Sequence, residues 1–133
     1  MTGEVIARRV RVLVADDDDN VRSALEQLID GSPGFEVIGC AAETNEAIAL
    51  AATHYPDVAV LDISMPGGGG LRAAAEICQL SPDTKIVALS ARSDSGSKSA
   101  MGAAGAVRYV VKGDDVDLLD VICEVMSSSD TGS

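Results

Sequence analysis

An apolar run that ends in an acid lies near the middle of the chain: Val58-Ala59-Val60-Leu61-Asp62-Ile63-Ser64-Met65-Pro66. Its first positions are apolar without alternation, which is typical of a strand buried on both faces of a sheet. We take Val58–Ile63 as a strand. Four other β-branched, apolar runs have the same character: Val10–Ala15, Phe35–Cys40, Lys85–Ser90 and Val107–Val111. The sequence therefore predicts five buried strands at nearly even spacing.

Segments with a helical period separate these strands and follow the last one. The third helix is predicted to bury a stripe formed by Leu71, Ala74, Ala75 and Cys78. The fifth is predicted to start at Asp114 as its N-cap and to bury Val116, Leu119, Ile122, Cys123 and Met126. Strands that alternate with helices form a parallel sheet covered on both faces. We predict an α/β fold, a doubly wound five-stranded parallel sheet of order 2-1-3-4-5 with a flavodoxin-like arrangement.

The composition of the 133 residues fits one cytoplasmic domain. A net charge of −11 makes the chain a poor nucleic-acid binder, because phosphate contacts need clustered Lys and Arg. No apolar run approaches the roughly 20 residues that span a bilayer, so we expect no membrane partner. Three separated cysteines are predicted to be buried thiols: Cys40, Cys78 and Cys123. We expect a folded domain over residues 9–126, a flexible segment over 1–8 and a flexible tail or linker over 127–133.

Acidic residues follow two of the predicted strands. The first strand ends in Asp16-Asp17-Asp18-Asp19, and the third ends in Asp62. One of the four consecutive acids can cap the next helix while the others are solvated, which is the simplest explanation of the cluster alone. In the predicted strand order, however, strands one and three are neighbours, so Asp62 lies beside Asp16 and Asp17. Three converging carboxylates favour a hard cation, Mg²⁺ with Mn²⁺ as a substitute.

Two further polar residues stand at the ends of the fourth and fifth predicted strands. Strand four ends in Ser90 and strand five is followed by Lys112. Each is unremarkable alone, since serine is common at strand ends and a single lysine is usually a solvated charge. Together with the acids they provide what phosphoryl transfer onto a carboxylate requires: a nucleophile, positive charge for the phosphoryl oxygens and a hydroxyl donor.

These motifs resemble the receiver domains of bacterial two-component response regulators over about residues 10–126. The resemblance depends on Val12-Leu13-Val14-Ala15-Asp16-Asp17 with Arg22, and on Leu61-Asp62-Ile63-Ser64-Met65-Pro66 leading to Gly70-Leu71. It also depends on Ala88-Leu89-Ser90-Ala91 and on Gly105-Ala106-Val107-Arg108-Tyr109-Val110-Val111-Lys112. The glycine-rich loop at Met65–Gly70 and the Lys112-Gly113 pair are similar to the subfamily whose receivers precede a helix-turn-helix output domain.

The resemblance implies a role for each site residue. Asp62 is the phosphoacceptor, and Asp17 and the backbone carbonyl of Ser64 bind Mg²⁺ directly. Asp16 acts on the metal largely through water. Ser90 and Lys112 contact the new phosphoryl group, and Tyr109 is the aromatic switch that moves with Ser90. Ser64 and Arg92 occupy positions that tune the phosphoryl lifetime.

The resemblance also implies partners: a histidine kinase or phosphotransfer protein as donor, and an output domain or protein as target, reached directly or through a homodimer. The output is expected to be transcriptional and to be controlled by the surface of the fourth helix, fifth strand and fifth helix. The domain is not expected to be an enzyme beyond its own phosphoryl uptake and hydrolysis. No organic cofactor is expected.

One departure keeps an alternative open. Gly113 stands where most receivers have a proline joined through a cis bond. Because a cis bond without proline costs about 2.5–4 kcal/mol, this turn need not share the family's shape. The alternative is a pseudo-receiver, an interaction module that signals without phosphate. An enzyme on the same sheet is disfavoured, because a flavin site needs a phosphate loop where this chain has four acids.

Overall fold

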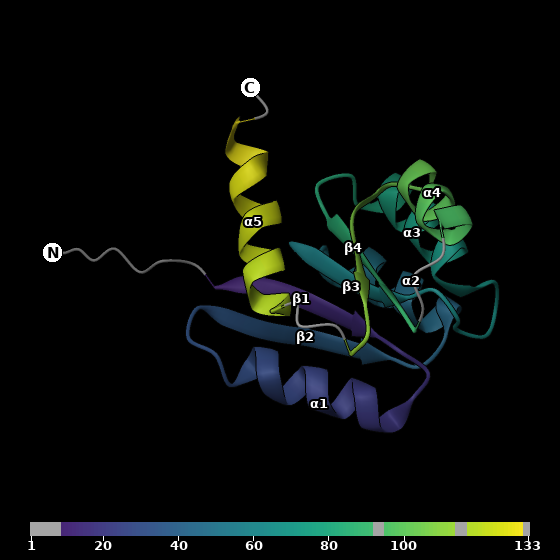
Figure 1. Ribbon diagram of the computed structural model, residues 1–133. Helices are drawn as coiled ribbons and strands as arrows, with labels where there is room; N and C mark the ends of the chain where they lie inside the picture. The colour runs from purple at the N-terminus through teal and green to yellow at the C-terminus, as the bar shows by residue number, and fades with distance from the viewer. Residues whose placement is uncertain (1–8, 92–94, 114–116, 132–133) are drawn as a thin grey trace, which may run out of the picture.

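Five parallel strands form the sheet in the computed structural model, which describes residues 9–91, 95–113 and 117–131. The strands are β1 (Val10–Ala15), β2 (Phe35–Ala41), β3 (Val58–Asp62), β4 (Lys85–Ser90) and β5 (Ala106–Val111). Their order is β2-β1-β3-β4-β5, which confirms the predicted doubly wound sheet (Figure 1). All predicted strands form, with ends that differ by no more than one residue from the apolar runs.

Helices cover both faces of this sheet. They are α1 (Asp19–Asp30), α2 (Thr44–His54), α3 (Gly69–Leu80), α4 (Ser95–Ala103) and α5 (Leu118–Thr131). Helices α1 and α5 lie on one face, and α2, α3 and α4 lie on the other (Figure 1). None of the described helices is both long and apolar enough to cross a membrane.

The two faces have cores of different composition, because side chains alternate along each strand. Leu13 and Ala15 of β1 point to the face under α2, α3 and α4, while Val12 and Val14 point to the face under α1 and α5. The first core is rich in alanine and the second in valine.

The helix ends follow local rules. Asp18 is the N-cap of α1, since its carboxylate accepts the N–H groups of Asn20 and Val21. Gly31 caps the other end of α1 through its own N–H, which donates to the carbonyl of Gln27. Helix α3 stops at Leu80, two residues before Pro82.

The buried face predicted for α3 is wrong in part. Ala74 is buried as predicted and Cys78 is partly buried, but Ala75 is exposed and Leu71 is 44% exposed. The buried residues of the helix are Gly69, Gly70, Ala73, Ala74 and Ile77. Alanine occupies positions 73–75 in a row and is tolerated both inside and outside a protein, so these residues do not show which face of the helix is buried.

Helix α5 also differs from expectation. Ile122 is buried and Leu119 and Met126 pack against the core as predicted, but Cys123 is exposed and Cys40 and Cys78 are only partly buried. The helix is regular through Thr131, although a tail was expected from residue 127. No glycine or proline stands between 127 and 131 to end it. Asp114, Val116 and the segment 1–8 lie outside the described residues.

Candidate functional site

Residues with predicted roles meet at the carboxyl edge of the sheet. Asp16 and Asp17 follow β1, Asp62 ends β3, Ser90 ends β4, and Lys112 follows β5. Because β3 pairs with β1 on one side and with β4 on the other, Asp62 lies at the centre of this group. The predicted convergence of the acids is confirmed.

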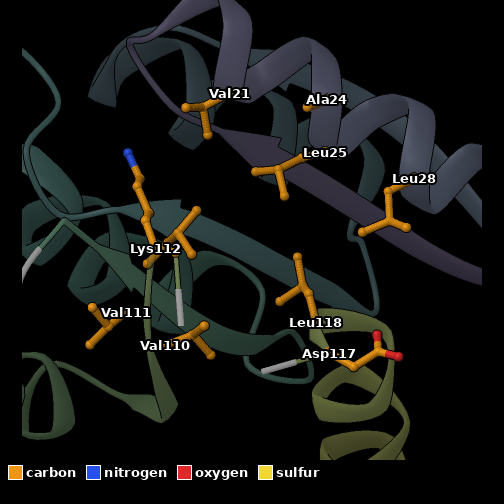
Figure 2. Close-up of a pocket in the computed structure, with 11 residues that line it drawn as sticks. Val21, Ala24, Leu25, Leu28, Val110, Val111, Lys112, Asp117 and Leu118 are labelled. Carbon is orange, nitrogen blue, oxygen red and sulfur yellow. The ribbon is translucent and has the colours of Figure 1, made fainter. Parts of the chain in front are cut away.

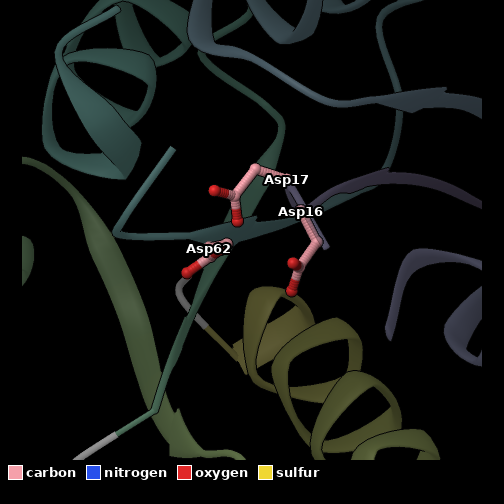
Figure 3. A group of neighbouring side chains, drawn as sticks. All are labelled: Asp16, Asp17 and Asp62. Carbon is pink, nitrogen blue, oxygen red and sulfur yellow. The ribbon is translucent and has the colours of Figure 1, made fainter. Parts of the chain in front are cut away.

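The three carboxylates form a compact acidic cluster. Asp16, Asp17 and Asp62 each offer one oxygen, and these oxygens lie within 4.8 Å of one another (Figure 3). Asp16 is fully buried and Asp62 is 2% exposed, whereas Asp17 faces solvent. The second oxygen of Asp16, Oδ2, is buried and lies 2.8 Å from Lys112 Nζ. Three carboxylates gathered around one ammonium group leave an excess of negative charge, and an all-oxygen set of this kind fits a hard divalent cation.

Backbone N–H groups orient two of these carboxylates. The N–H of Asp18 donates to Asp16 Oδ1 at 2.9 Å, and that of Ser64 donates to Asp62 Oδ1 at 3.1 Å. Each bond fixes one oxygen of its carboxylate, and the other oxygen, Oδ2, lies near Lys112 Nζ. Asp62 Oδ2 is therefore the oxygen available for chemistry.

Lys112 supplies positive charge to the cluster. Its Nζ lies 2.8 Å from Asp16 Oδ2 and 3.5 Å from Asp62 Oδ2. Burial alone lowers the pKa of Lys112, but the hydrogen bond with Asp16 and attraction by both carboxylates outweigh it, so the pKa is raised. The lysine is a fixed cation at neutral pH.

The pKa of Asp62 is raised above its ordinary value. Burial is the main cause, and repulsion by Asp16 acts in the same direction, while the Ser64 N–H and Lys112 lower it. Charge on this carboxylate is thus unfavourable in the protein as it stands. A bound cation or a covalent bond at Asp62 would relieve that cost.

Ser90 is the last residue of β4, and Tyr109 lies on the neighbouring strand β5. Ser90 is buried, and its carbonyl accepts the N–H of Lys112 at 2.6 Å. Tyr109 is half-buried and packs against the core under α2, α3 and α4. The pairing of β4 with β5 sets Ala88 opposite Tyr109 and Ser90 opposite Val111. The two predicted switch residues therefore belong to one strand pair.

The turn after Lys112 does not need the family's cis bond. The Lys112–Gly113 peptide bond is trans, and Gly113 adopts a φ of 86°, a left-handed conformation that favours glycine. Lys112 still reaches Asp16. Of the two predicted tuning residues, Ser64 is exposed beside Asp62, and Arg92 lies outside the described residues.

The remaining acids of the first loop have structural roles. Asp18 caps α1, as the simpler explanation of the cluster required, and Asp19 forms an ion pair with Arg22. The guanidinium of Arg22 also donates to the backbone carbonyl of Asp16 at 2.8 Å. Sequence analysis noted Arg22 only as part of a motif and missed that it holds the loop carrying the acids.

An apolar groove of about 360 Å³ adjoins the site between α1 and α5 (Figure 2). Leu25 and Leu28 of α1, Val110 of β5 and Leu118 of α5 line it, and the stem of Lys112 forms part of its wall. The groove is lined mostly by apolar side chains, so we place the chemistry at the acidic cluster.

Comparison with known proteins gives one consistent family. Residues 12–123 match the response regulator receiver domain. Response regulator GacA of Pseudomonas viridiflava is 36% identical over 104 residues, which cover 78% of this chain and 49% of GacA. The chain thus spans about half the length of the curated relatives it matches.

Two solved structures are similar over most of their length. A LuxR-family response regulator from Aurantimonas has 30% identity and a TM-score of 0.85, covering 90% of this chain and 86% of that one. The CheX-CheY-BeF3-Mg²⁺ complex from Borrelia burgdorferi contains a chain with 28% identity and a TM-score of 0.77. That match covers 91% of this chain and 90% of the other.

Proposed function

The chain belongs to the response regulator receiver domain family of two-component signalling, and we propose that it is a switch controlled by phosphorylation of Asp62. The observation that carries this proposal is the position of the Asp62 carboxylate. It is buried at the sheet edge, within reach of Asp16 and Asp17 and 3.5 Å from Lys112 Nζ. A histidine kinase or phosphotransfer protein is the proposed donor.

In the proposed reaction Asp62 Oδ2 attacks the phosphorus atom of the donor. A bond forms between this oxygen and phosphorus, and the bond from phosphorus to the donor nitrogen breaks in line with it. The donor imidazole leaves with the electron pair and takes up a proton. Lys112 binds the oxygens of the phosphoryl group, and the Ser90 hydroxyl donates to one of them after transfer.

Asp16, Asp17, Asp62 and the backbone carbonyl of Ser64 would hold Mg²⁺, with Mn²⁺ as a substitute. The bound cation would neutralise charge on the phosphoryl oxygens. The similar Borrelia structure contains Mg²⁺ together with BeF3, which supports this choice of metal. Removal of divalent cations should therefore abolish phosphorylation.

The proposed output is a change in the surface formed by α4, β5 and α5. Phosphorylation shifts a balance between two states, and Ser90 and Tyr109 are the residues that distinguish them. The proposed target is an output domain or a protein partner, reached directly or through a homodimer. The proposed location of the domain is the cytoplasm, and its proposed effect is on transcription. We propose no enzymatic activity beyond phosphoryl uptake and hydrolysis at Asp62.

The decisive experiment is intact mass after incubation with a small acyl phosphate or phosphoramidate. We expect one phosphoryl adduct on the wild-type protein with Mg²⁺ and none with EDTA. Asp62→Asn should give no adduct, because the amide is a poor nucleophile. Asp83→Asn is the matched control: it removes an exposed carboxylate and should label like wild type.

Each other outcome has a definite meaning. Labelling that persists in Asp62→Asn would show that another group is the acceptor. No adduct on the wild-type protein with any donor would favour the pseudo-receiver, which signals without phosphate.

A further inference from the structure

The loop between β3 and α3 begins beside the proposed acceptor and contains Ser64. We propose that Thr44, in the first turn of α2, is a positioning residue that holds this loop so that the Ser64 carbonyl can bind the metal. This inference rests on the proposed function, because it assigns Thr44 a role in the same metal site. It joins α2, which contributes no residue to the acidic cluster, to the chemistry at the sheet edge.

Thr44 is fully buried and directs two donors at the loop. Its backbone N–H donates to the carbonyl of Pro66 at 3.0 Å, and its hydroxyl Oγ1 donates to the carbonyl of Gly69 at 3.1 Å. The first acceptor lies in the middle of the loop, and the second belongs to Gly69, the first residue of α3. One residue thus attaches the loop to α2 at two points.

The hydroxyl of Thr44 does not serve its own helix. Threonine at a helix start commonly caps the free N–H groups of the first turn. In α2 the N-cap is Glu43, which makes no side-chain cap bond, and the Thr44 hydroxyl points to a carbonyl 25 residues away. A buried hydroxyl with a distant backbone partner is a specific restraint on that partner.

The loop needs such a restraint because its sequence is flexible. Gly67, Gly68 and Gly69 all have positive φ, at 92°, 110° and 72°. Glycine loses more conformational freedom on folding than any other residue. Hydrogen bonds from residues outside the loop therefore help to fix its shape. Besides the two bonds from Thr44, the guanidinium of Arg72 donates to the Gly67 carbonyl at 2.8 Å.

Ser64 lies between two fixed points as a result. On one side its N–H donates to Asp62 Oδ1, and on the other Met65 is buried in the core and the Pro66 carbonyl is held by Thr44. Mg²⁺ demands near-ideal octahedral geometry at short distances. In a more mobile loop the Ser64 carbonyl would occupy a wider range of positions, and binding of the metal would be weaker.

The test compares Thr44→Val with Thr53→Val. Valine keeps the shape of threonine and removes the hydroxyl; Thr53 is an exposed residue of the same helix whose hydroxyl bonds only within α2, to the Ala49 carbonyl. Thr44→Ser retains the hydroxyl and serves as the rescue. Mg²⁺ affinity is measured by titration of backbone amide signals, and amide hydrogen exchange is measured in the metal-free proteins.

We expect Thr44→Val to bind Mg²⁺ about five- to tenfold more weakly, the effect of losing one buried hydrogen bond. The amides of Gly67–Gly70 should exchange faster in this variant without metal. Thr44→Ser keeps a hydroxyl that can donate to the Gly69 carbonyl, and Thr53 makes no bond to that carbonyl. Both Thr44→Ser and Thr53→Val should therefore bind Mg²⁺ within about twofold of wild type.

A second variant guards against misfolding of the first. Arg72→Gln removes the exposed bond to the Gly67 carbonyl, together with the bonds to Asn45 and Glu76, and should speed amide exchange of Gly67–Gly70 in the metal-free protein. Wild-type Mg²⁺ affinity in Thr44→Val, or unchanged exchange of Gly67–Gly70 in both variants, would overturn the inference and leave the proposed function standing. A wild-type protein that binds no Mg²⁺ would overturn the proposed metal site and this inference with it.

Discussion

Asp62 is buried among groups that affect its charge in opposite directions. Burial raises its pKa most, repulsion by Asp16 adds to that, and the Ser64 N–H and Lys112 lower it. Because the net direction is upward, the ionised side chain destabilises the folded protein relative to the unfolded chain. An acid kept at a cost to stability is typical of a functional site.

We expect Asp62→Asn to be more stable than wild type at pH 7 without divalent cations. The raised pKa means that stability present with protonated Asp62 is lost as the pH rises through the folded-state pKa. Asparagine is neutral at every pH, so the variant should unfold at a higher temperature than wild type at pH 7. The difference should shrink as the pH falls towards the ordinary pKa of 3.8. Thermal unfolding in EDTA between pH 7 and pH 4 measures it.

Asp83→Asn again serves as the control and should change stability little, since Asp83 is exposed. Added Mg²⁺ should stabilise wild type more than Asp62→Asn, because a ligand stabilises only the state that binds it. Lower stability of Asp62→Asn in EDTA at pH 7 would mean that attraction to Lys112 outweighs the cost of burial.

Sequence reasoning located the acids of the site but not the residues that support them. Strand order alone brings the ends of β1 and β3 together, whatever the loops do. The division of roles between Asp17 and Asp18 depends on the backbone at the start of α1, where Asp18 has the extended conformation of an N-cap. Thr44 was missed because its partners are backbone carbonyls far along the chain, which have no sequence signature.

Helix α4 is short and has a small buried face. Met101 is its one buried residue in the described part of the chain, and three serines and two glycines occupy much of its length. Serine and glycine are poorer helix formers than alanine. This composition makes the helix a suitable part for a surface that changes state.

Gly102→Ala should stabilise α4 without disturbing its packing. A Cβ at this position meets nothing within 4 Å, and the φ of Gly102 is not in the left-handed region. Alanine in a helix interior is favoured over glycine by about 0.5–1 kcal/mol. Urea unfolding and amide exchange in α4 would measure the gain in stability.

Gly34→Ala is the control. Space for a Cβ is also open at Gly34, but its φ is 87°, so alanine should destabilise the protein there. A gain in stability in both variants would contradict the argument.

The strands were more predictable than the faces of the helices. Uninterrupted runs such as Val58–Leu61 are apolar whichever face they meet, and every residue of β3 is buried. In α3 the choice of face depends on contacts with α2 and the sheet, since alanine is tolerated on either side. Its Leu71 is exposed, although size and hydrophobicity favoured burial.

The arrangement of the sheet links the site to one side of the domain. Ser90 ends β4 and Lys112 follows β5, and the neighbouring α4 and α5 flank these strands. The backbone bond from Lys112 to Ser90 joins the two strand ends directly. A phosphoryl group that engages both side chains therefore acts on this strand pair first, while α2 lies over β1 and β2 at the other part of the sheet.

Beryllofluoride, a mimic of the phosphoryl group, should therefore change amide signals unevenly across the domain. The reference is the protein with Mg²⁺ alone, so that the effect of metal binding does not contribute to the shifts. We expect the largest shifts around Ser90–Lys112 and smaller ones in α2. Asp62→Asn, which lacks the acceptor carboxylate, should show no such shifts and serves as the control. Uniformly small shifts in the wild-type protein would mean that occupation of Asp62 does not reach α4, β5 and α5, and would favour a module that signals without phosphate.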